Sequence, residues 1–231
     1  MTRRITNHLS RSDAVMARLI AAAGPYELVP ELECTLFRAL ARAVSHQQLH
    51  ANAANAILRR FTESCGEGDF PTPDEVLAAP TKKMRAAGFS LAKIAALKDL
   101  AEKTLEGIVP ERAHLAGIDD AQIIERITQV RGIGRWTVEM MLMFQLGRPD
   151  VLPVDDFGVR TGFRLTYGLR KMPPPRVLAA YGERWKPHRT AAAWYLWRAV
   201  DLSKEGKLPP PCERIRLPRL KRRKARAKRA K

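Results

Sequence analysis

A short segment around Gly132 and Gly134 has the residue types needed to hold an anion. Both glycines lie between two segments with helical apolar spacing, and glycine takes backbone conformations that other residues avoid. A helix that begins at Gly134 would point its first amide groups and its positive dipole end outward. Such a helix end binds an anion without side-chain charge. Residues 130–134 could equally form an ordinary glycine-capped corner between two helices.

A pair of adjacent carboxylates, Asp155 and Asp156, follows after an apolar stretch and a loop. The pair opens another helical segment, so a helix N-cap is the simplest role for either residue. An ionised carboxylate at this place could also stabilise positive charge that develops on a sugar ring, or orient an attacking water. The sequence pattern alone leaves both roles open.

The elements that must position these residues are predicted to be helices throughout. Residues 51–61, 90–105 and 119–128 have the apolar spacing of amphipathic helices, and Thr72-Pro-Asp-Glu75 has the residues of a helix start. Residues 138–144 are apolar on several faces, which is typical of a helix that runs through a core. Because no stretch alternates as a half-buried strand does, the prediction is an all-α protein of roughly ten helices.

The charge of the chain indicates a polyanionic partner. The formal net charge is +17 and the pI is about 10.4, which fits a nucleic acid or an anionic membrane surface. Residues 213–231 hold eleven Lys or Arg and one acid, and the rest of the chain is still basic. Residues 1–208 are predicted to form the folded domain. Residues 209–231 are predicted to be a disordered basic tail that contacts phosphates, or a solvated tail without a specific role.

The cysteines and the apolar segments exclude several classes of protein. Cys34, Cys65 and Cys212 are far apart and form no Cys-x-x-Cys, so neither a disulfide framework nor a structural zinc site is expected. Reduced thiols are the default for such a chain. No segment has the roughly 18 apolar residues of a membrane span, and no apolar signal core follows the N-terminus. We therefore expect a cytoplasmic protein, associated with the nucleoid if it is bacterial, with no membrane partner.

Five motifs, in order along the chain, resemble those of the helix-hairpin-helix DNA glycosylases. They are Gln47-Gln-Leu-His50, Gly88-Phe-Ser-Leu-Ala-Lys93, Gly132-Ile-Gly-Arg-Trp-Thr137, Leu152-Pro-Val-Asp-Asp156 and Glu183-Arg-Trp-Lys-Pro-His-Arg189. The chain is most similar to the alkylation-repair branch, 3-methyladenine DNA glycosylase II, in a compact form without the N-terminal β-rich domain. The resemblance implies two helical subdomains with a helix-hairpin-helix motif and the active site in the cleft between them. Arg131 departs from the pattern, since the family often has Pro there.

The resemblance assigns the catalytic carboxylate to Asp156, which leaves Asp155 as the expected helix cap. It implies that the extruded base lies in a pocket lined by Trp136, Phe157, Trp197 and Met140. Electron-rich rings attract a cationic methylated purine by about 1–2 kcal/mol each when desolvated. Trp197 could instead be a core residue of the last helix, which is the role predicted for Trp194.

The DNA contacts also follow from the resemblance. Extrusion of a base leaves a gap in the duplex, and a protein side chain must fill it. Gln48 matches the wedge of the family, although Leu49 could take this role, and His50 would contact the minor groove beside it. A helix start with a polar cap is the alternative for this segment. The remaining DNA contacts are expected at the hairpin, from Gly132, Gly134, Arg135 and Thr137.

The resemblance also bears on ions and on the type of reaction. The backbone carbonyls of Thr128, Val130 and Ile133 could hold a structural Na⁺ or K⁺, and no cofactor is required. Trp136 stands where strand-cutting relatives carry a lysine nucleophile. The chain also lacks the four clustered cysteines of the iron–sulfur branch.

The expected activity is that of a monomeric, monofunctional glycosylase. It would act on double-stranded DNA containing damaged bases, excise alkylated purines such as 3-methyladenine and 7-methylguanine, and leave an abasic site. The alternative is a non-catalytic helix-hairpin-helix module that only binds DNA. A glycosylase for oxidised or mispaired bases is a third possibility, against which the missing lysine and cysteines argue.

Overall fold

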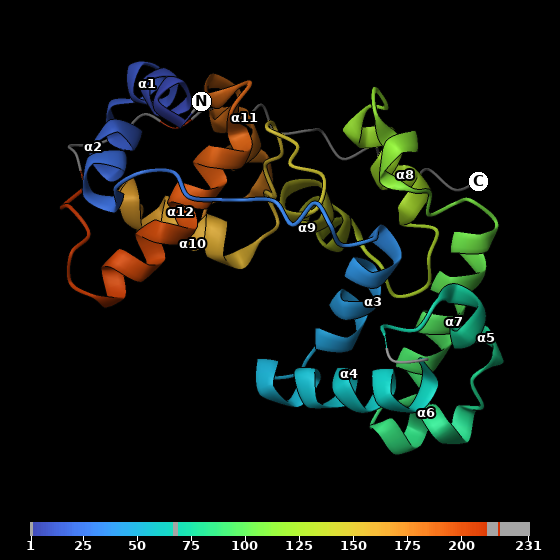
Figure 1. Cartoon of the computed structure of the whole chain (residues 1–231). Coiled ribbons are helices and arrows are strands. Elements are labelled where there is room, and N and C mark those ends of the chain that lie inside the picture. The colour runs from blue at the N-terminus through green and yellow to red at the C-terminus, as the bar shows by residue number, and fades with distance from the viewer. Residues whose placement is uncertain (1, 67–68, 212–216, 218–231) are drawn as a thin grey trace, which may run out of the picture. The chain divides into compact units, whose positions relative to one another are not determined.

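Helices account for all the regular structure of the computed structural model (Figure 1), which describes residues 2–66, 69–211 and 217. The all-α prediction is confirmed, since no strand occurs within these ranges. The described residues form twelve α-helices and two 3-10 helices. In chain order these are α1 (Thr2–Ser12), α2 (Ala14–Ala23), α3 (Leu36–His46), α4 (Ala51–Cys65), α5 (Pro73–Ala78), α6 (Thr81–Ala87), α7 (Leu91–Leu105), η1 (Arg112–Leu115), α8 (Asp120–Ile127), α9 (Arg135–Phe144), α10 (Phe157–Thr166), α11 (Pro175–Gly182), η2 (Glu183–Trp185) and α12 (Arg189–Lys204).

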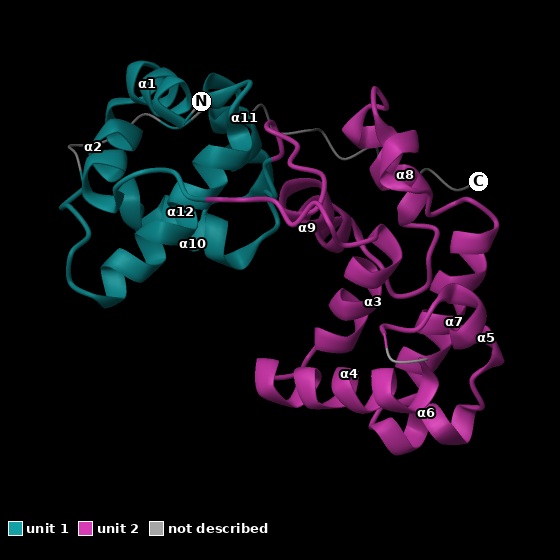
Figure 2. Ribbon diagram, in the orientation of Figure 1, with its two compact units in different colours: residues 1–27, 152–231 teal, residues 28–151 magenta. Residues whose placement is uncertain are grey.

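The chain divides into two compact units (Figure 2). Unit 1 comprises residues 1–27 and 152–231, and unit 2 comprises residues 28–151. Unit 1 is therefore built from both ends of the sequence, whereas unit 2 is one continuous stretch. The predicted basic tail lies, apart from residues 209–211 and 217, outside the described residues.

Unit 1 is built around a close approach of α10 and α12. A side chain at Gly162 would place its Cβ 1.8 Å from the carbonyl oxygen of Leu196, so only glycine lets the two backbones come this near. Gly158, one turn earlier on the same face of α10, would place a Cβ 2.8 Å from Cδ1 of Trp197. The two glycines therefore set how α12 lies on α10.

A buried carboxylate joins the two chain segments of unit 1. Asp13, which is 5% exposed, caps α2 and accepts hydrogen bonds from the amides of Val15 and Met16. It also accepts a bond from the Tyr167 hydroxyl at 2.6 Å and one from Nε1 of Trp185 at 3.1 Å. Burial and the neighbouring Asp13 charge raise the pKa of Tyr167 well above its usual value. The motif at residues 183–189 therefore includes a core tryptophan that ties α2 to η2.

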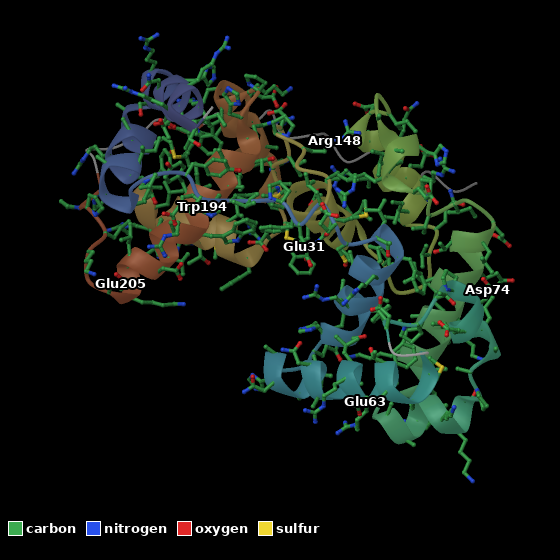
Figure 3. All side chains as sticks on the ribbon, in the orientation of Figure 1. Glu31, Glu63, Asp74, Arg148, Trp194 and Glu205 are labelled. Atoms are coloured by element: carbon green, nitrogen blue, oxygen red, sulfur yellow. The ribbon has the colours of Figure 1, made fainter. Side chains whose placement is uncertain are left out.

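Trp194 takes part in the packing of the same unit (Figure 3). Its ring lies edge-on against Tyr26 at 5.4 Å and against Tyr195 at 4.9 Å between centroids. The Tyr195 hydroxyl donates to the carbonyl of Gly24 at 3.0 Å. This environment agrees with the packing role predicted for Trp194.

Unit 2 is assembled on α3, α4, α7 and α9. Helix α7 packs against α3, α5 and α6, and α9 packs against α3 and α8. The predicted helix start at Thr72 is confirmed as a capping box, in which Thr72 Oγ1 accepts from the Glu75 amide and Glu75 accepts from the Thr72 amide. Helix α9 buries most of its residues from Thr137 to Met143, as the apolar pattern predicts.

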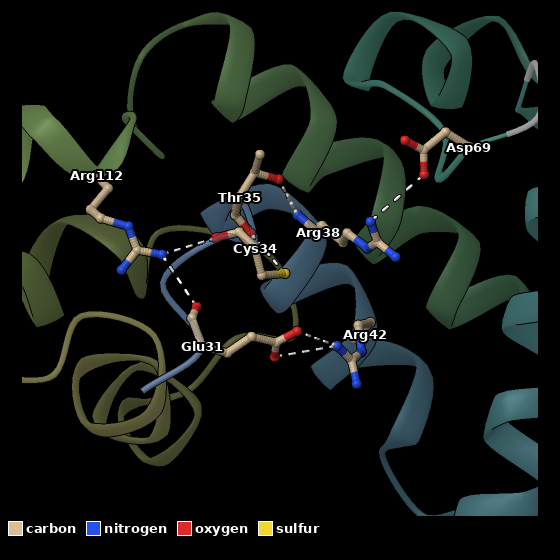
Figure 4. A network of polar contacts seen from close by, with 7 residues as sticks. All are labelled: Glu31, Cys34, Thr35, Arg38, Arg42, Asp69 and Arg112. Atoms are coloured by element: carbon tan, nitrogen blue, oxygen red, sulfur yellow. Dashed lines mark hydrogen bonds and ion pairs between the residues drawn. The ribbon is translucent and has the colours of Figure 1, made fainter. Parts of the chain in front are cut away.

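A polar network fixes the segment that leads into α3 (Figure 4). The Arg112 guanidinium donates to the carbonyls of Glu31, Cys34 and Gln145, while the Glu31 carboxylate pairs with Arg42 at 3.4 Å. Burial is the main cause that raises the pKa of the Cys34 thiol. Backbone carbonyls of an irregular segment need such donors when water cannot reach them.

None of the described helices is long and apolar enough to span a membrane.

Candidate active site

Asp156 is the N-cap of α10, and the expectation that Asp155 would take this role is wrong. The Asp156 backbone is extended, with φ −63° and ψ 127°, and its Oδ1 accepts from the Val159 amide at 2.7 Å. Because the first helical residue is Phe157, only the residue directly before it can reach the third amide of the helix. Asp155 lies one residue too early and is exposed.

The same carboxylate oxygen of Asp156 receives a second hydrogen bond. Nε1 of Trp197, on α12, donates to Oδ1 at 2.9 Å. Gly158 leaves the space in which the Trp197 indole reaches this oxygen, since a Cβ there would lie 2.8 Å from the ring. Capping and chemistry are therefore not exclusive roles, because the two donors give the Asp156 carboxylate one defined orientation.

Phe157, the residue that follows Asp156, presents an apolar ring to solvent. Its side chain is 74% exposed, although large apolar residues are usually covered in a folded domain. Unit 1 therefore brings together three predicted site residues, Asp156, Phe157 and Trp197. The indole nitrogen of Trp197 faces the carboxylate, which the sequence did not indicate.

The predicted hairpin is present in unit 2, between α8 and α9. Gly132 has φ +76°, a left-handed conformation that favours glycine, and Gly134 is the N-cap of α9 without a side-chain hydrogen bond. The side chains of Val130 and Ile133 are buried and anchor the turn, whereas both glycines are exposed. The first intrahelical bond runs from the Val138 amide to the Gly134 carbonyl, so the amides before it lie at an exposed helix end.

Arg131, at the position where the family often has proline, makes a hydrogen bond that a proline could not make. Its backbone amide donates to Oδ2 of Asp99 at 2.7 Å, and a proline has no amide hydrogen to do this. Oδ1 of Asp99 accepts from Lys103 at 2.9 Å. Burial would raise the pKa of the Asp99 carboxyl, but the Arg131 amide and Lys103 together hold that pKa below its usual value. The turn is tied to α7 by a charged acceptor.

The first turns of α9 carry four predicted site residues in different environments. Trp136 is 49% exposed, whereas Thr137 is 7% exposed, so any DNA contact of Thr137 would have to come from its backbone amide. The Arg135 guanidinium pairs with the buried carboxylate of Glu139 at 2.8 Å and keeps much of its surface exposed. Met140 lines a cavity of about 280 Å³ between α3 and α9.

The segment between α3 and α4 presents the predicted wedge to solvent. Gln48 has φ +58°, the left-handed conformation that non-glycine residues rarely adopt. Gln48, Leu49 and His50 are all exposed, and Leu49 is 41% exposed. His50 is the N-cap of α4 but makes no side-chain capping bond, which argues against the polar-cap alternative. Nε2 of the neighbouring Gln47 donates to the Gly132 carbonyl at 2.9 Å.

The predicted cation ligands are backbone carbonyls of the hairpin. Thr128 is the C-cap of α8, and the Val130 carbonyl accepts from the Ile133 amide at 3.1 Å. A carbonyl oxygen has two lone pairs, so this bond leaves Val130 able to ligate an ion. No group of three or more His, Cys, Asp or Glu within the described ranges could hold a metal with side chains.

Comparisons with known proteins place the chain in a family. Residues 41–188, more than half of the chain, match the HhH-GPD superfamily of base excision DNA repair proteins. DNA-3-methyladenine glycosylase 1 of Schizosaccharomyces pombe is 44% identical over 197 residues, which cover 85% of this chain and 86% of that protein. The chain therefore belongs to the HhH-GPD superfamily.

Solved structures agree with this assignment. The 3-methyladenine DNA glycosylase of S. pombe in complex with abasic DNA superimposes with a TM-score of 0.77 at 42% identity, over 87% of this chain and 98% of the other. A DNA-3-methyladenine glycosidase from Bacillus halodurans gives a TM-score of 0.80 at 31% identity, over 87% and 91% of the two chains.

Some residues that support the site were not singled out from the sequence. Gly158 lies two positions after Asp156, but only the packing of α12 reveals why a glycine is needed there. Lys93 ends one of the quoted motifs, yet no contact was expected of it. Gln47 opens one of the five motifs, but no role was predicted for it, and Asp99 gave no separate signal because polar residues on a helix are common.

Proposed function

We propose that this protein is a monofunctional DNA glycosylase that excises alkylated purines from double-stranded DNA and leaves an abasic site. The observation that carries the proposal is the carboxylate of Asp156, which the Val159 amide and the Trp197 indole orient, one residue before the exposed Phe157. A relative of 44% identity, named DNA-3-methyladenine glycosylase 1, supports the substrate class.

Asp156 would act on the sugar rather than on the base. Breaking an N-glycosidic bond builds positive charge on the deoxyribose, and a nearby carboxylate stabilises that charge. The carboxylate would also orient or deprotonate the water that attacks the sugar. A base made cationic by alkylation is already a good leaving group, so the reaction does not depend on a strong general acid.

The hairpin would hold the DNA backbone while the base is extruded. An exposed helix end with Gly132 and Gly134 lets a phosphate approach the amides at the start of α9. Arg135 would add positive charge, limited by its pairing with Glu139. The exposed segment Gln48–His50 would enter the duplex, with Gln48 or Leu49 in the gap and His50 in the minor groove. Residues 213–231, which lie outside the described residues, would add non-specific phosphate contacts.

Aromatic and soft apolar side chains of each unit would contact the extruded base. Trp136 and Phe157 are both exposed large aromatics, on which an extruded base could stack. Met140, in unit 2, and the ring of Trp197, in unit 1, would add to these contacts. Rings of this type favour a cationic methylated purine over a neutral one.

The absence of an amine nucleophile limits the reaction to base removal. Trp136, the second residue of α9, stands where strand-cutting relatives carry a lysine, and its indole cannot form a Schiff base. The chemistry needs no cofactor, and the carbonyls of Thr128, Val130 and Ile133 would hold a Na⁺ or K⁺ that supports the turn. We expect a monomer that acts on cellular DNA in the cytoplasm, at the nucleoid if the protein is bacterial.

Release of 3-methyladenine and 7-methylguanine from methylated duplex DNA tests the proposal. Wild-type protein and the Asp156→Asn variant are compared under single-turnover conditions, with the abasic product detected by alkaline cleavage. Release by the wild type and its loss in the variant are expected. If neither protein releases a base but both bind duplex DNA, the chain is a binding module, and the glycosylase assignment fails.

A further inference from the structure

Helix α7 supports the end of α3 through one lysine. Nζ of Lys93 donates to the carbonyl of Ser45 at 2.7 Å and to the carbonyl of Gln47 at 2.9 Å. These carbonyls lie at the C-terminal end of α3, where a helix lacks partners for its last acceptors and favours a cation. Burial lowers the pKa of Lys93. The lysine therefore fixes the backbone from which the segment Gln48–His50 leaves.

Gln47 connects that segment to the hairpin. Its backbone carbonyl accepts from Lys93, and its side-chain Nε2 donates to the Gly132 carbonyl at 2.9 Å. One residue thus bonds in two directions, toward α7 with its backbone and toward the turn with its side chain. The next residue, Gln48, is the one with the left-handed backbone. Such a conformation persists where the surrounding contacts determine it.

The same helix also holds the hairpin. Oδ2 of Asp99 accepts from the Arg131 amide at 2.7 Å, and a Cβ placed on Gly132 would contact the Ala96 methyl at 3.4 Å. Lys93, Ala96 and Asp99 follow one another at three-residue spacing, so they lie along one side of α7. A single side of one helix therefore contacts the hairpin and the residue that directly precedes the segment Gln48–His50.

We propose that Gln47 and Lys93 are positioning residues that set the distance between the wedge segment Gln48–His50 and the phosphate-binding hairpin. When a phosphate binds the hairpin, Gln48–His50 is then held at a fixed depth in the duplex. Binding of the DNA backbone therefore also positions the segment that fills the gap. The proposal rests on the proposed glycosylase function. It predicts that the hydrogen bond from Gln47 to Gly132 contributes to base extrusion and not to general DNA affinity.

Gln47→Met tests this, because methionine keeps the length of the side chain and removes the donor. Gln122→Met, the same change at an exposed position on α8, is the matched control. Single-turnover release of 7-methylguanine is measured opposite cytosine and opposite a mismatched adenine, where extrusion costs less. Fluorescence of a 2-aminopurine next to the lesion reports extrusion directly.

The expected loss for Gln47→Met is about fivefold to tenfold opposite cytosine, the scale of one neutral hydrogen bond, and less than about twofold opposite adenine. Affinity for undamaged duplex and the thermal unfolding midpoint should match those of Gln122→Met. Equal losses on both duplexes, or no loss on either, would overturn the proposal while the glycosylase function stands. A wild-type protein that releases no base overturns both.

Lys93→Met provides an independent check through the same segment. If Lys93 acts through Gln47, the double variant loses little more than the more impaired single variant. Independent, multiplying losses in rate and in 2-aminopurine signal would show that the two residues do not act together, and would overturn their joint role. Because Lys93 is partly buried, unfolding curves are recorded for each variant, and only the folded fraction enters the rates.

Discussion

Asp13 and Asp156 have nearly the same local chemistry in unit 1 and very different surroundings. Each caps a helix with its Oδ1, and each accepts an indole N–H, from Trp185 at 3.1 Å and from Trp197 at 2.9 Å. Asp13 is 5% exposed and also accepts the Tyr167 hydroxyl, whereas Asp156 is partly exposed and precedes a phenylalanine that is 74% exposed.

A hydrogen-bond pattern does not by itself separate a structural carboxylate, such as Asp13, from the carboxylate proposed to act on the sugar, Asp156. Both patterns hold a carboxylate in one orientation. Whether a substrate can reach the oriented carboxylate decides whether it can take part in a reaction. Around Asp13 every contact joins parts of the fold. Asp156 is partly exposed, and the residue after it, Phe157, is 74% exposed, so a substrate could reach this carboxylate.

Replacing each carboxylate by an amide, one at a time, would give the largest difference in excision rate between the two sites. Asp156→Asn should lower single-turnover excision about 10²- to 10⁴-fold, because the amide cannot stabilise the charged sugar or activate water. Its unfolding midpoint should stay near that of the wild type, since asparagine also caps helices. Asp13→Asn should instead keep the excision rate of the folded protein. A rate loss of similar size in both variants would remove the distinction between them.

Removal of the buried carboxylate would give the next largest effect. Asp13→Ala should lower the free energy of unfolding by about 3 kcal/mol, because a helix cap is lost and the Tyr167 hydroxyl and Trp185 indole lose their acceptor. Urea unfolding followed by tryptophan fluorescence measures this. An Asp13→Ala protein as stable as the wild type would contradict the structural role.

The two tryptophans sharpen the comparison further. Trp197→Phe removes the indole N–H from Asp156 and should slow excision about tenfold, since the carboxylate loses one of its two orienting bonds. Trp185→Phe should lower stability by about 1–3 kcal/mol and leave the rate of the folded protein unchanged. Excision rates and unfolding curves are measured for both variants. A stability loss without a rate loss in Trp197→Phe, or a rate loss in folded Trp185→Phe, would contradict these roles.

Alkaline pH should weaken the cluster around Asp13 and give the smallest effect. Burial, and then the Asp13 charge, raise the pKa of both Tyr167 and Tyr181, and burial raises the pKa of Tyr195 to about 12. Folded-state pKa values above the unfolded value of about 10 mean that this stability is present below pH 10 and is lost as the pH rises toward 12. Unfolding midpoints between pH 9 and pH 11 should fall less steeply in Tyr167→Phe; a parallel fall in both proteins would exclude this cause.

The sequence was sufficient for the helices and for the order of the motifs. Apolar periodicity and capping residues are local signals, which is why the capping box at Thr72 and the buried helix after Gly134 were predictable. The choice between Asp155 and Asp156 failed because it depends on the exact first residue of α10. The bond from Trp197 to Asp156 was not predictable, since it requires the close packing of Gly158 and Gly162 against α12.

Asp13 shows most clearly what could not be predicted from the sequence. Before an apolar run it has the character of a simple N-cap, and nothing near it in the sequence indicates a buried cluster. Its partners Tyr167 and Trp185 are 154 and 172 positions away. A single sequence contains no signal for contacts at that separation, because each partner alone is an ordinary core aromatic.

These separations have a consequence for how the protein is made. Unit 2 is one continuous stretch, residues 28–151, so its whole sequence has been synthesised before Tyr167 and Trp185 exist. Helix α2 emerges first but must wait for both aromatics before Asp13 has its partners, and contacts of such long separation form slowly. During synthesis the hairpin therefore has its complete folding unit earlier than Asp156 does. A nascent chain could therefore bind DNA before unit 1, which base excision also requires, has folded.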